Sequence, residues 1–155
     1  MVKNIFWSYI AGFLDADGSI YVQLKQNSTY KYDFQISPSV VFYQKDNGEK
    51  GLPEIYEKLN LGHLRYRKDG KVELIVSDKK SIRLLLSKVM KFLILKVKQA
   101  QLMLLILDKM EGIKTKQDFI SVAELIDEFR NLNYSRKRTV DSRMVKHHLE
   151  EIQNL

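Results

Sequence analysis

The spacing of apolar residues along this chain changes from a helical period to a period of two, and then back. Residues 4–14 carry apolar side chains at the spacing of a buried helical stripe, at Ile5, Phe6, Tyr9, Ile10, Phe13 and Leu14. The stretch from Asp15 to Gly18 is predicted to end this helix. From Ser19 onward, apolar and polar residues alternate as far as Lys25, which predicts a strand with one buried face.

A second alternating run extends over residues 34–43, and the polar stretch 26–29 is predicted to form the connecting loop. Pro38 lies in the middle of this run. Because proline cannot donate a hydrogen bond to a ladder, it indicates a bulge or an edge position. We therefore expect a long hairpin whose second strand is bent.

The rest of the chain repeats helix and hairpin and then continues with helices. Helical spacing returns over residues 52–61, where Pro53 suits a first turn. Two short strands follow, separated by Lys68-Asp-Gly70, and Asp-Gly is typical of hairpin turns. Further helices are predicted over 77–89, 96–110, 117–129 and 140–152. This order predicts an α+β domain that covers residues 1–155.

The composition indicates a globular chain and the kind of partner it binds. Of the 155 residues, 45% are hydrophobic and 29% charged, which is typical of a globular chain with a real core. Lys and Arg number 26 against 19 Asp and Glu, so 26 − 19 gives a net charge of +7. A compact basic chain favours an anionic partner, and nucleic acid is the commonest large one.

Several classes are excluded or disfavoured. The chain contains no cysteine, which excludes disulfide scaffolds, thiolate zinc sites and cysteine nucleophiles. The longest apolar run, near residues 102–107, is far shorter than the roughly 20 residues of a membrane span, and the first residues lack a secretory signal. We expect an intracellular protein without a membrane partner. His147 and His148 lack the spacing of a zinc helix and are expected on a surface helix.

The nonapeptide Ile10-Ala-Gly-Phe-Leu-Asp-Ala-Asp-Gly18 distinguishes between the remaining function classes. It resembles the LAGLIDADG motif of the homing endonucleases, and it is identical to that motif at Ala11, Gly12, Asp15, Ala16, Asp17 and Gly18. An isolated D-x-D-G would fit an ordinary helix-ending turn. The resemblance covers the whole chain, because the predicted order matches the family's αββαββα core, a saddle-shaped antiparallel sheet with C-terminal helices.

The single copy of the motif implies, through this resemblance, that two chains act together as a homodimer. Small residues allow two helices to approach closely. The expected dimer contacts are Ile10, Ala11, Gly12 and Phe13.

The resemblance also implies the catalytic residues. It assigns Asp17 as catalytic residue and metal ligand, with the Ala16 carbonyl beside it, and a carboxylate there suits Mg²⁺, although other divalent cations are possible. Asp15 is instead expected to belong to the helix end. Gln44 matches the family's polar residue near the active-site water, and Lys96 matches its active-site lysine, able to stabilise charge as the phosphate reacts.

One departure concerns a basic residue that relatives often carry shortly after the glutamine. The aligned position here is Gly48, and either Lys45 or Lys50 could substitute for it.

The outward strand residues and the basic loops supply a candidate surface for double-stranded DNA. Amides, hydroxyls and cations read base edges in the major groove, and Lys and Arg bind phosphates. The predicted DNA-binding residues are Tyr21, Gln23, Lys25, Asn27, Gln35, Ser37, Ser39, Val41, Tyr43, Lys45, His63, Arg65, Arg67, Lys68, Lys98, Ser135, Arg136 and Arg138.

The resemblance implies a sequence-specific endonuclease in an organelle or a microbial cytoplasm. It would make a metal-dependent double-strand cut with short 3′ overhangs at a long pseudo-palindromic site, as part of intron homing. The alternative is a maturase-like RNA splicing factor, or a non-cleaving DNA-binding protein, on the same fold. A third hypothesis is a basic structural domain with an accidental motif, which predicts a monomer without nuclease activity.

Overall fold

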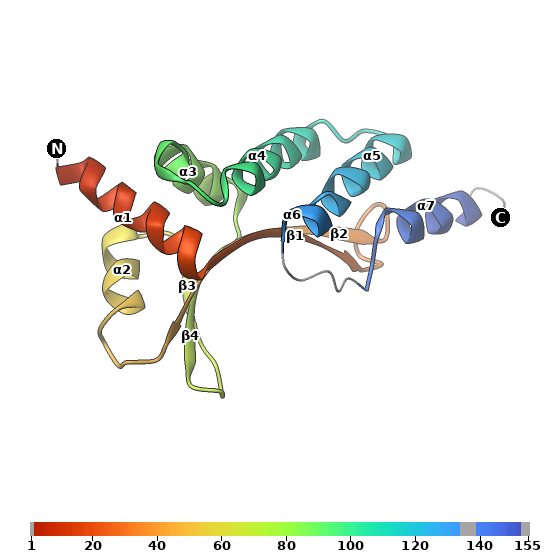
Figure 1. Cartoon of the computed structure of the whole chain (residues 1–155). Coiled ribbons are helices and arrows are strands. Elements are labelled where there is room, and N and C mark those ends of the chain that lie inside the picture. Colours follow the sequence, from red (N-terminus) through yellow and green to blue (C-terminus); the bar gives the residue numbers. More distant parts are fainter. Residues whose placement is uncertain (1, 134–138, 153–155) are drawn as a thin grey trace. The chain divides into compact units, whose positions relative to one another are not determined.

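The computed structural model describes residues 2–133 and 139–152 of the chain (Figure 1). In chain order, its elements are α1 (Val2–Asp17), β1 (Gly18–Gln26), β2 (Phe34–Lys45), α2 (Leu52–Leu59), β3 (His63–Tyr66), β4 (Lys71–Val76), α3 (Lys79–Val89), the 3₁₀ turn η1 (Met90–Phe92), α4 (Val97–Glu111), α5 (Lys116–Asp127), α6 (Phe129–Leu132) and α7 (Ser142–Glu151). This order confirms the predicted α+β class and its αββαββα core with C-terminal helices.

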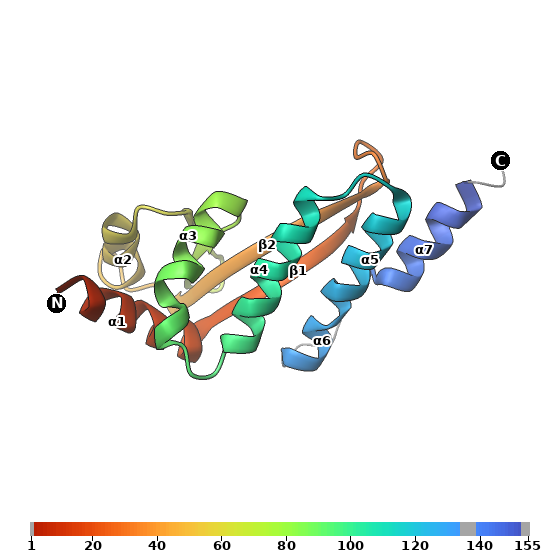
Figure 2. The same cartoon turned by 90° about the horizontal axis from the view of Figure 1, so that it is seen from above.

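The four strands form one antiparallel sheet in the order β1-β2-β4-β3. The long strands β1 and β2 run side by side in both views (Figure 2). The register between β2 and β4 begins at Val40, opposite Val76, and ends at Lys45. Pro38 therefore precedes the stretch that pairs with β4. Its missing N–H therefore costs no bond to that strand, although β2 as a whole lies between β1 and β4.

The chain divides into two compact units. Unit 1 comprises Met1–Tyr21 and Pro38–Ala100, and unit 2 comprises Val22–Ser37 and Gln101–Leu155. The strands β1 and β2 each contribute residues to both units. A single endonuclease domain over residues 1–155 stays a prediction.

In unit 1, α1 packs on α3 and η1, and α2 packs on β3 and β4. The apolar stripe of α1 supplies Ile10 and Leu14 to a fully buried core that also contains Phe42 and Leu74 from the sheet. The α1 helix ends at Asp17, within the stretch from Asp15 to Gly18 that was predicted to end it.

In unit 2, α5 packs on α7 and α6. The α5 helix begins with a capping box, in which Thr115 and Asp118 each accept a hydrogen bond from the other's backbone N–H. The single helix predicted over 117–129 is divided, because α5 ends at Asp127 and α6 begins at Phe129. At the start of α7, the Asp141 carboxylate accepts a hydrogen bond from the Met144 N–H.

Three predicted DNA-binding residues, Ser135, Arg136 and Arg138, lie outside the described residues. Within residues 2–133 and 139–152, no helix combines the length and the apolar character needed to cross a bilayer.

Candidate functional site

Asp17 occupies the last position of α1, and both Asp17 and the preceding Ala16 are exposed. Over residues 2–133 and 139–152, the Asp17 carboxylate accepts no hydrogen bond and forms no ion pair. Its oxygens are therefore available to a ligand from outside the chain. Carboxylate oxygens are the ligands that hard divalent cations prefer.

The Asp15 side chain has a different role, because it binds the backbone that precedes α4. Its Oδ2 accepts hydrogen bonds from the N–H groups of Ile94 (2.7 Å) and Leu95 (3.1 Å), and its Oδ1 accepts one from Lys96 (3.0 Å). The side chain is 9% exposed. A carboxylate that holds three N–H donors fixes the two segments together, so Asp15 has the structural role that the sequence analysis expected.

Lys96 returns this contact, since its Nζ donates to the Asp15 main-chain carbonyl. Burial lowers the pKa of Lys96, and the negative charges of Asp15 and Asp17 oppose part of that effect. A desolvated ammonium beside two carboxylates is held in a fixed place at the end of α1. The structure therefore brings together Asp15, Asp17 and Lys96.

A single chain supplies few metal ligands at this point. The described residues contain no group of three or more His, Asp or Glu side chains that could hold a metal ion. Mg²⁺ nevertheless does not need such a cage, because it is commonly held by one or two carboxylates together with waters and substrate phosphates. The exposed Asp17 carboxylate and the Ala16 carbonyl fit that kind of site.

Gln44, the third predicted catalytic residue, contacts the start of α2. Its Oε1 accepts a hydrogen bond from the Leu52 N–H (2.8 Å). Gly51 caps this helix with φ of 82°, and a Cβ on Gly51 would lie 2.1 Å from the same Oε1. No hydrogen bond from Gln44 to the Asp15–Lys96 pair occurs among the described residues. Its role near an active-site water stays a prediction.

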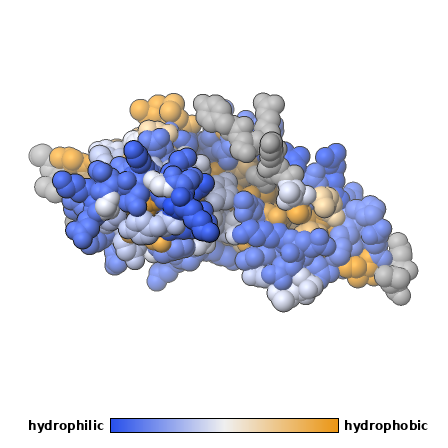
Figure 3. All heavy atoms as spheres, turned by 90° about the horizontal axis from the view of Figure 1, so that it is seen from below, coloured by the Kyte–Doolittle hydropathy of each residue, from blue (hydrophilic) through white to orange (hydrophobic). Residues whose placement is uncertain are grey.

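One face of the sheet collects several of the predicted DNA-binding residues. The register sets Val41 opposite Ile75 and Ile75 opposite His63. Two residues further along each strand, it sets Tyr43 opposite Glu73 and Glu73 opposite Arg65. These six residues therefore share a face, as the alternating pattern predicted. The surface seen from below is mostly hydrophilic, with apolar side chains in small groups (Figure 3).

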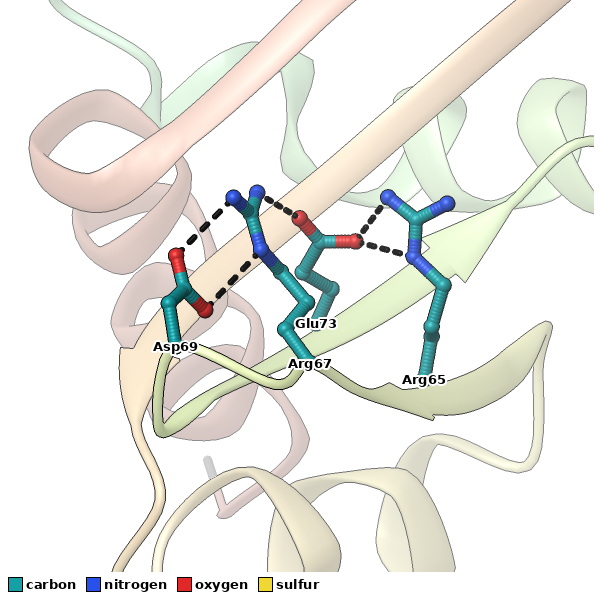
Figure 4. A network of polar contacts seen from close by, with 4 residues as sticks. All are labelled: Arg65, Arg67, Asp69 and Glu73. Atoms are coloured by element: carbon teal, nitrogen blue, oxygen red, sulfur yellow. Dashed lines mark hydrogen bonds and ion pairs between the residues drawn. The ribbon is translucent and has the colours of Figure 1, made fainter.

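Glu73 lies at the centre of an ionic network on this face (Figure 4). It accepts hydrogen bonds from Arg65 Nε (2.6 Å) and Arg67 Nη1 (2.9 Å), and Arg67 also binds Asp69 (2.9 Å). The Glu73 side chain is 1% exposed, whereas Arg65 is 59% exposed. Burial acts to raise the pKa of Glu73, but the hydrogen bonds and charges of Arg67 and Arg65 outweigh it and lower that pKa. The buried acid therefore holds two exposed guanidinium groups in fixed positions.

Glu73 is not among the residues predicted from the sequence. A signal was available, because Glu73 is an acid that alternates with Val72, Leu74 and Val76 on a strand next to two arginines.

Two of the predicted DNA contacts need correction. Val41 is 1% exposed and Ser39 is 8% exposed, so neither offers a usable surface. Both belong to β2, which is flanked by β1 and β4, and Val41 in addition lies opposite Ile75. Side chains on an interior strand are covered by their neighbours even on the more polar face.

The other described DNA-binding predictions lie at or near the surface. Tyr43 is half-buried; burial raises the pKa of its hydroxyl, and a hydrogen bond with Ser19 opposes that effect. Asn27 is also half-buried, and its Oδ1 accepts a hydrogen bond from the Thr29 N–H. Tyr21, Gln35 and Ser37 are half-buried, and the exposed members of the set are Gln23, Lys25, Lys45, His63, Arg65, Arg67, Lys68 and Lys98. Lys50 is exposed as well, so exposure does not choose between Lys45 and Lys50 as a substitute at Gly48.

The predicted dimer contacts also change. Ile10 and Ala11 are completely buried inside the chain, so neither offers a surface to a second copy. Phe13 is half-buried and packs on Phe42, with ring centroids 5.6 Å apart. The sequence analysis assigned the motif as a block, whereas only one side of a helix can be exposed. That side contains Ile5, Tyr9, Gly12 and Ala16.

The family model described as LAGLIDADG endonuclease matches residues 10–107, which cover α1, the whole sheet and most of α4. The chain belongs to the LAGLIDADG endonuclease family. It is a single-motif member of this family and a DNA endonuclease.

Similar LAGLIDADG proteins match over nearly the whole chain. DNA endonuclease I-CreI from Chlamydomonas reinhardtii is 34% identical over 95% of this chain and 90% of that protein. DNA endonuclease I-CvuI from Chlorella vulgaris is 31% identical over 94% of this chain and 91% of that protein. The structure of I-CvuI with I-CreI target DNA in 2 mM Mg²⁺, in which the DNA is not cleaved, superposes with a TM-score of 0.93 at 29% identity and covers 99% of this chain and 98% of that one. Another structure of I-CvuI contains its own target in the presence of Ca²⁺.

Proposed function

We propose that this LAGLIDADG endonuclease is a homing enzyme that acts as a homodimer on a long pseudo-palindromic DNA site. It cuts both strands in a reaction that requires Mg²⁺ and leaves short 3′ overhangs. The observation that carries the proposal is the exposed Asp17 carboxylate at the end of α1, next to a helix face that is itself exposed.

The exposed face of α1 supports the homodimer. Ile5 and Tyr9 are 65% and 59% exposed, which is unusual for large apolar side chains. Gly12 and Ala16 continue the same face with small side chains, and an added Cβ on Gly12 would meet no atom within 4 Å. Small residues let two such helices approach closely. A two-fold axis along this face brings two Asp17 carboxylates together, one from each chain.

The turn after η1 is a second exposed apolar surface, next to the end of α1. Ile94 and Leu95 are 83% and 71% exposed, and Asp15 at the end of α1 binds their N–H groups. Burial of these side chains against a second copy would remove them from water, which is favourable at about 25 cal/mol per Å².

Each residue of the site then has a part in phosphodiester hydrolysis. Asp17 and the Ala16 carbonyl would hold Mg²⁺, which would supply charge stabilisation to the reacting phosphate. Lys96, fixed by Asp15, stabilises negative charge as the phosphate reacts. Gln44 orders solvent through its amide NH₂ group, while its Oε1 stays on α2.

Recognition is the task of the polar sheet face. Glu73 holds Arg65 and Arg67 on this face, where their exposed guanidinium groups have further N–H groups to donate to guanine or phosphate. The exposed Gln23, Lys25 and His63 add donors for base edges and phosphates. The enzyme acts inside the cell, in an organelle or a microbial cytoplasm, on an allele that lacks the mobile element.

The test is cleavage of a randomised pseudo-palindromic DNA library with Mg²⁺, by the wild-type protein and by Asp17→Asn, followed by sequencing of the cut ends. We expect staggered cuts by the wild type and none by the variant, which should still bind the selected site in Ca²⁺. Sedimentation should give the mass of two chains. Binding without cleavage by the wild type would contradict the proposal and favour a maturase or a non-cleaving binder; a monomer would contradict the homodimer.

A further inference from the structure

The loop between β1 and β2 is a closed structure within unit 2. The Asn27 N–H donates to the Asp33 carbonyl (2.8 Å), and the Asp33 N–H donates to the Tyr30 carbonyl (2.9 Å). The Asn27 side chain accepts hydrogen bonds from the N–H (3.1 Å) and the hydroxyl (2.7 Å) of Thr29. Residues 28–31 at the tip are exposed. Their positions therefore depend on how the last residue of the loop is held.

That last residue, Asp33, has a φ of 59°. The left-handed region is uncommon for residues other than glycine, although aspartate adopts it more readily than most. Such a conformation persists where the surrounding structure holds it in place.

A residue on α7 supplies this restraint. His148 Nε2 lies 2.9 Å from Asp33 Oδ2, and because a carboxylate only accepts, the imidazole donates. Both side chains are about one-third exposed. The His148 ring also meets the Phe34 ring edge-on, with centroids 5.3 Å apart at 87°. The histidine therefore contacts both the end of the loop and the first residue of β2.

Contacts with α5 and the turn before it complete the arrangement. The Tyr32 hydroxyl donates to the Lys114 carbonyl (2.9 Å), and the Tyr32 ring packs on Phe119 with centroids 5.1 Å apart. Tyr32 fixes the middle of the returning chain, whereas His148 is the side chain that binds the left-handed residue itself.

The neighbouring His147 provides an internal comparison. It is 74% exposed, and its Nδ1 lies 3.4 Å from Glu151 on its own helix. His147 and His148 both lie on α7, as expected, but on different sides of the helix, and His148 is the one that contacts Asp33.

We propose that His148 is a positioning residue for DNA recognition. By holding Asp33 in its left-handed conformation, it sets the direction of the exposed tip residues 28–31 and so determines base preference at the ends of the target site. This inference rests on the proposed function, in which the β1–β2 hairpin reads DNA.

The test uses variants on both sides of the contact. His148→Leu removes the donor, whereas His148→Gln keeps a donor near the position of Nε2. Asp33→Gly removes the carboxylate but accepts the left-handed backbone. His147→Leu is the matched control. Two measurements are made on the full-length protein: hydrogen exchange of the loop amides without DNA, and base preference from a randomised library.

We expect His148→Leu to raise loop exchange and to relax base preference at the ends of the site about tenfold, with the central bases unaffected. His148→Gln should restore much of the preference, and Asp33→Gly combined with His148→Leu should be no worse than either change alone. A melting curve identifies a variant that fails to fold. If His148→Leu does not fold, the base preference of His148→Gln tests the inference in its place. Unchanged end preference, or an equal loss at all bases, would overturn the inference and leave the proposed function standing. A wild-type protein that selects no DNA would overturn both.

Discussion

Asp15 and Lys96 form two reciprocal hydrogen bonds, in each of which the side chain of one residue binds the backbone of the other. The carboxylate of Asp15 accepts a hydrogen bond from the Lys96 N–H (3.0 Å), while Lys96 Nζ donates to the Asp15 carbonyl. The last turn of α1 is thereby joined to the start of α4. Asp17, two residues after Asp15, is held in place through this pair, although within residues 2–133 and 139–152 it makes no such contact itself.

The contrast between the two aspartates gives a first prediction. Asp15→Asn replaces one acceptor oxygen with an NH₂ group that faces an N–H donor, so buried donors lose their partner. We expect a loss of about 2–3 kcal/mol in the free energy of unfolding, which corresponds to about 4–12 °C in Tm. Cleavage should fall as well, because Asp17 and Lys96 lose their fixed positions. Thermal denaturation and a cleavage assay measure the two effects.

Asp17→Asn is the matched control. As an exposed residue it should change the free energy of unfolding by less than about 0.5 kcal/mol, yet reduce cleavage by more than about 100-fold. Equal destabilisation by both variants would contradict the division of roles.

The ionic network on β3 and β4 leads to a second prediction. Glu73→Gln removes the charge that orients Arg65 and Arg67 without changing the size of the side chain. We expect weaker discrimination at the bases these arginines contact, while total affinity changes little because both cations remain. Fluorescence binding to a selected site and to single-base variants measures this. Arg67→Lys should also weaken discrimination at these bases, since lysine cannot form a bidentate contact. A uniform loss of affinity for all sites would contradict the role of Glu73.

The pH dependence of stability gives a third prediction. The pKa of Glu73 is lower in the folded protein than its ordinary value of 4.5. A carboxyl with a depressed pKa contributes stability that is fully present above the unfolded value, near 4.3, and that is lost as the pH falls through the folded value. The wild type should therefore exceed Glu73→Gln in stability at pH 7, and the difference should shrink steadily below about pH 4.5. Denaturant unfolding at several pH values measures it, and a difference that is constant with pH would contradict the assignment.

The local patterns predicted the elements well because hydrophobic period and turn residues are local properties. The strands 18–26 and 34–45, and the hairpin around Asp69-Gly70, lie where alternation and Asp-Gly predicted them. The motif likewise located Asp17. What local patterns could not predict is how residues distant in sequence meet.

Two long-range contacts illustrate this limit. Asp15 accepts hydrogen bonds from residues 94–96, and His148 contacts Asp33 across 115 positions. In each case a polar side chain hydrogen-bonds to a group that only the folded chain brings near it. For the same reason, the expected surface at Ile10 and Ala11 was wrong, since α3 and η1 cover that side of α1.

Gly51 gives the last prediction, because it has a positive φ and also lies against the side chain of the predicted catalytic residue Gln44. Its φ of 82° strains any residue with a side chain, and a Cβ there would lie 2.1 Å from Gln44 Oε1. Gly51→Ala should therefore cost the strain of about 1–2 kcal/mol and, in addition, displace the Gln44 amide from the Leu52 N–H.

Gly48→Ala separates these two effects. Gly48 has a similar φ of 70°, but a Cβ on it would meet nothing within 4 Å. Both variants should lose stability through backbone strain, yet only Gly51→Ala should also alter the cleavage rate at saturating DNA if Gln44 orders solvent at the scissile phosphate. Denaturant unfolding and single-turnover cleavage measure the two quantities. A cleavage rate unchanged in Gly51→Ala, with its stability reduced, would restrict Gln44 to capping α2.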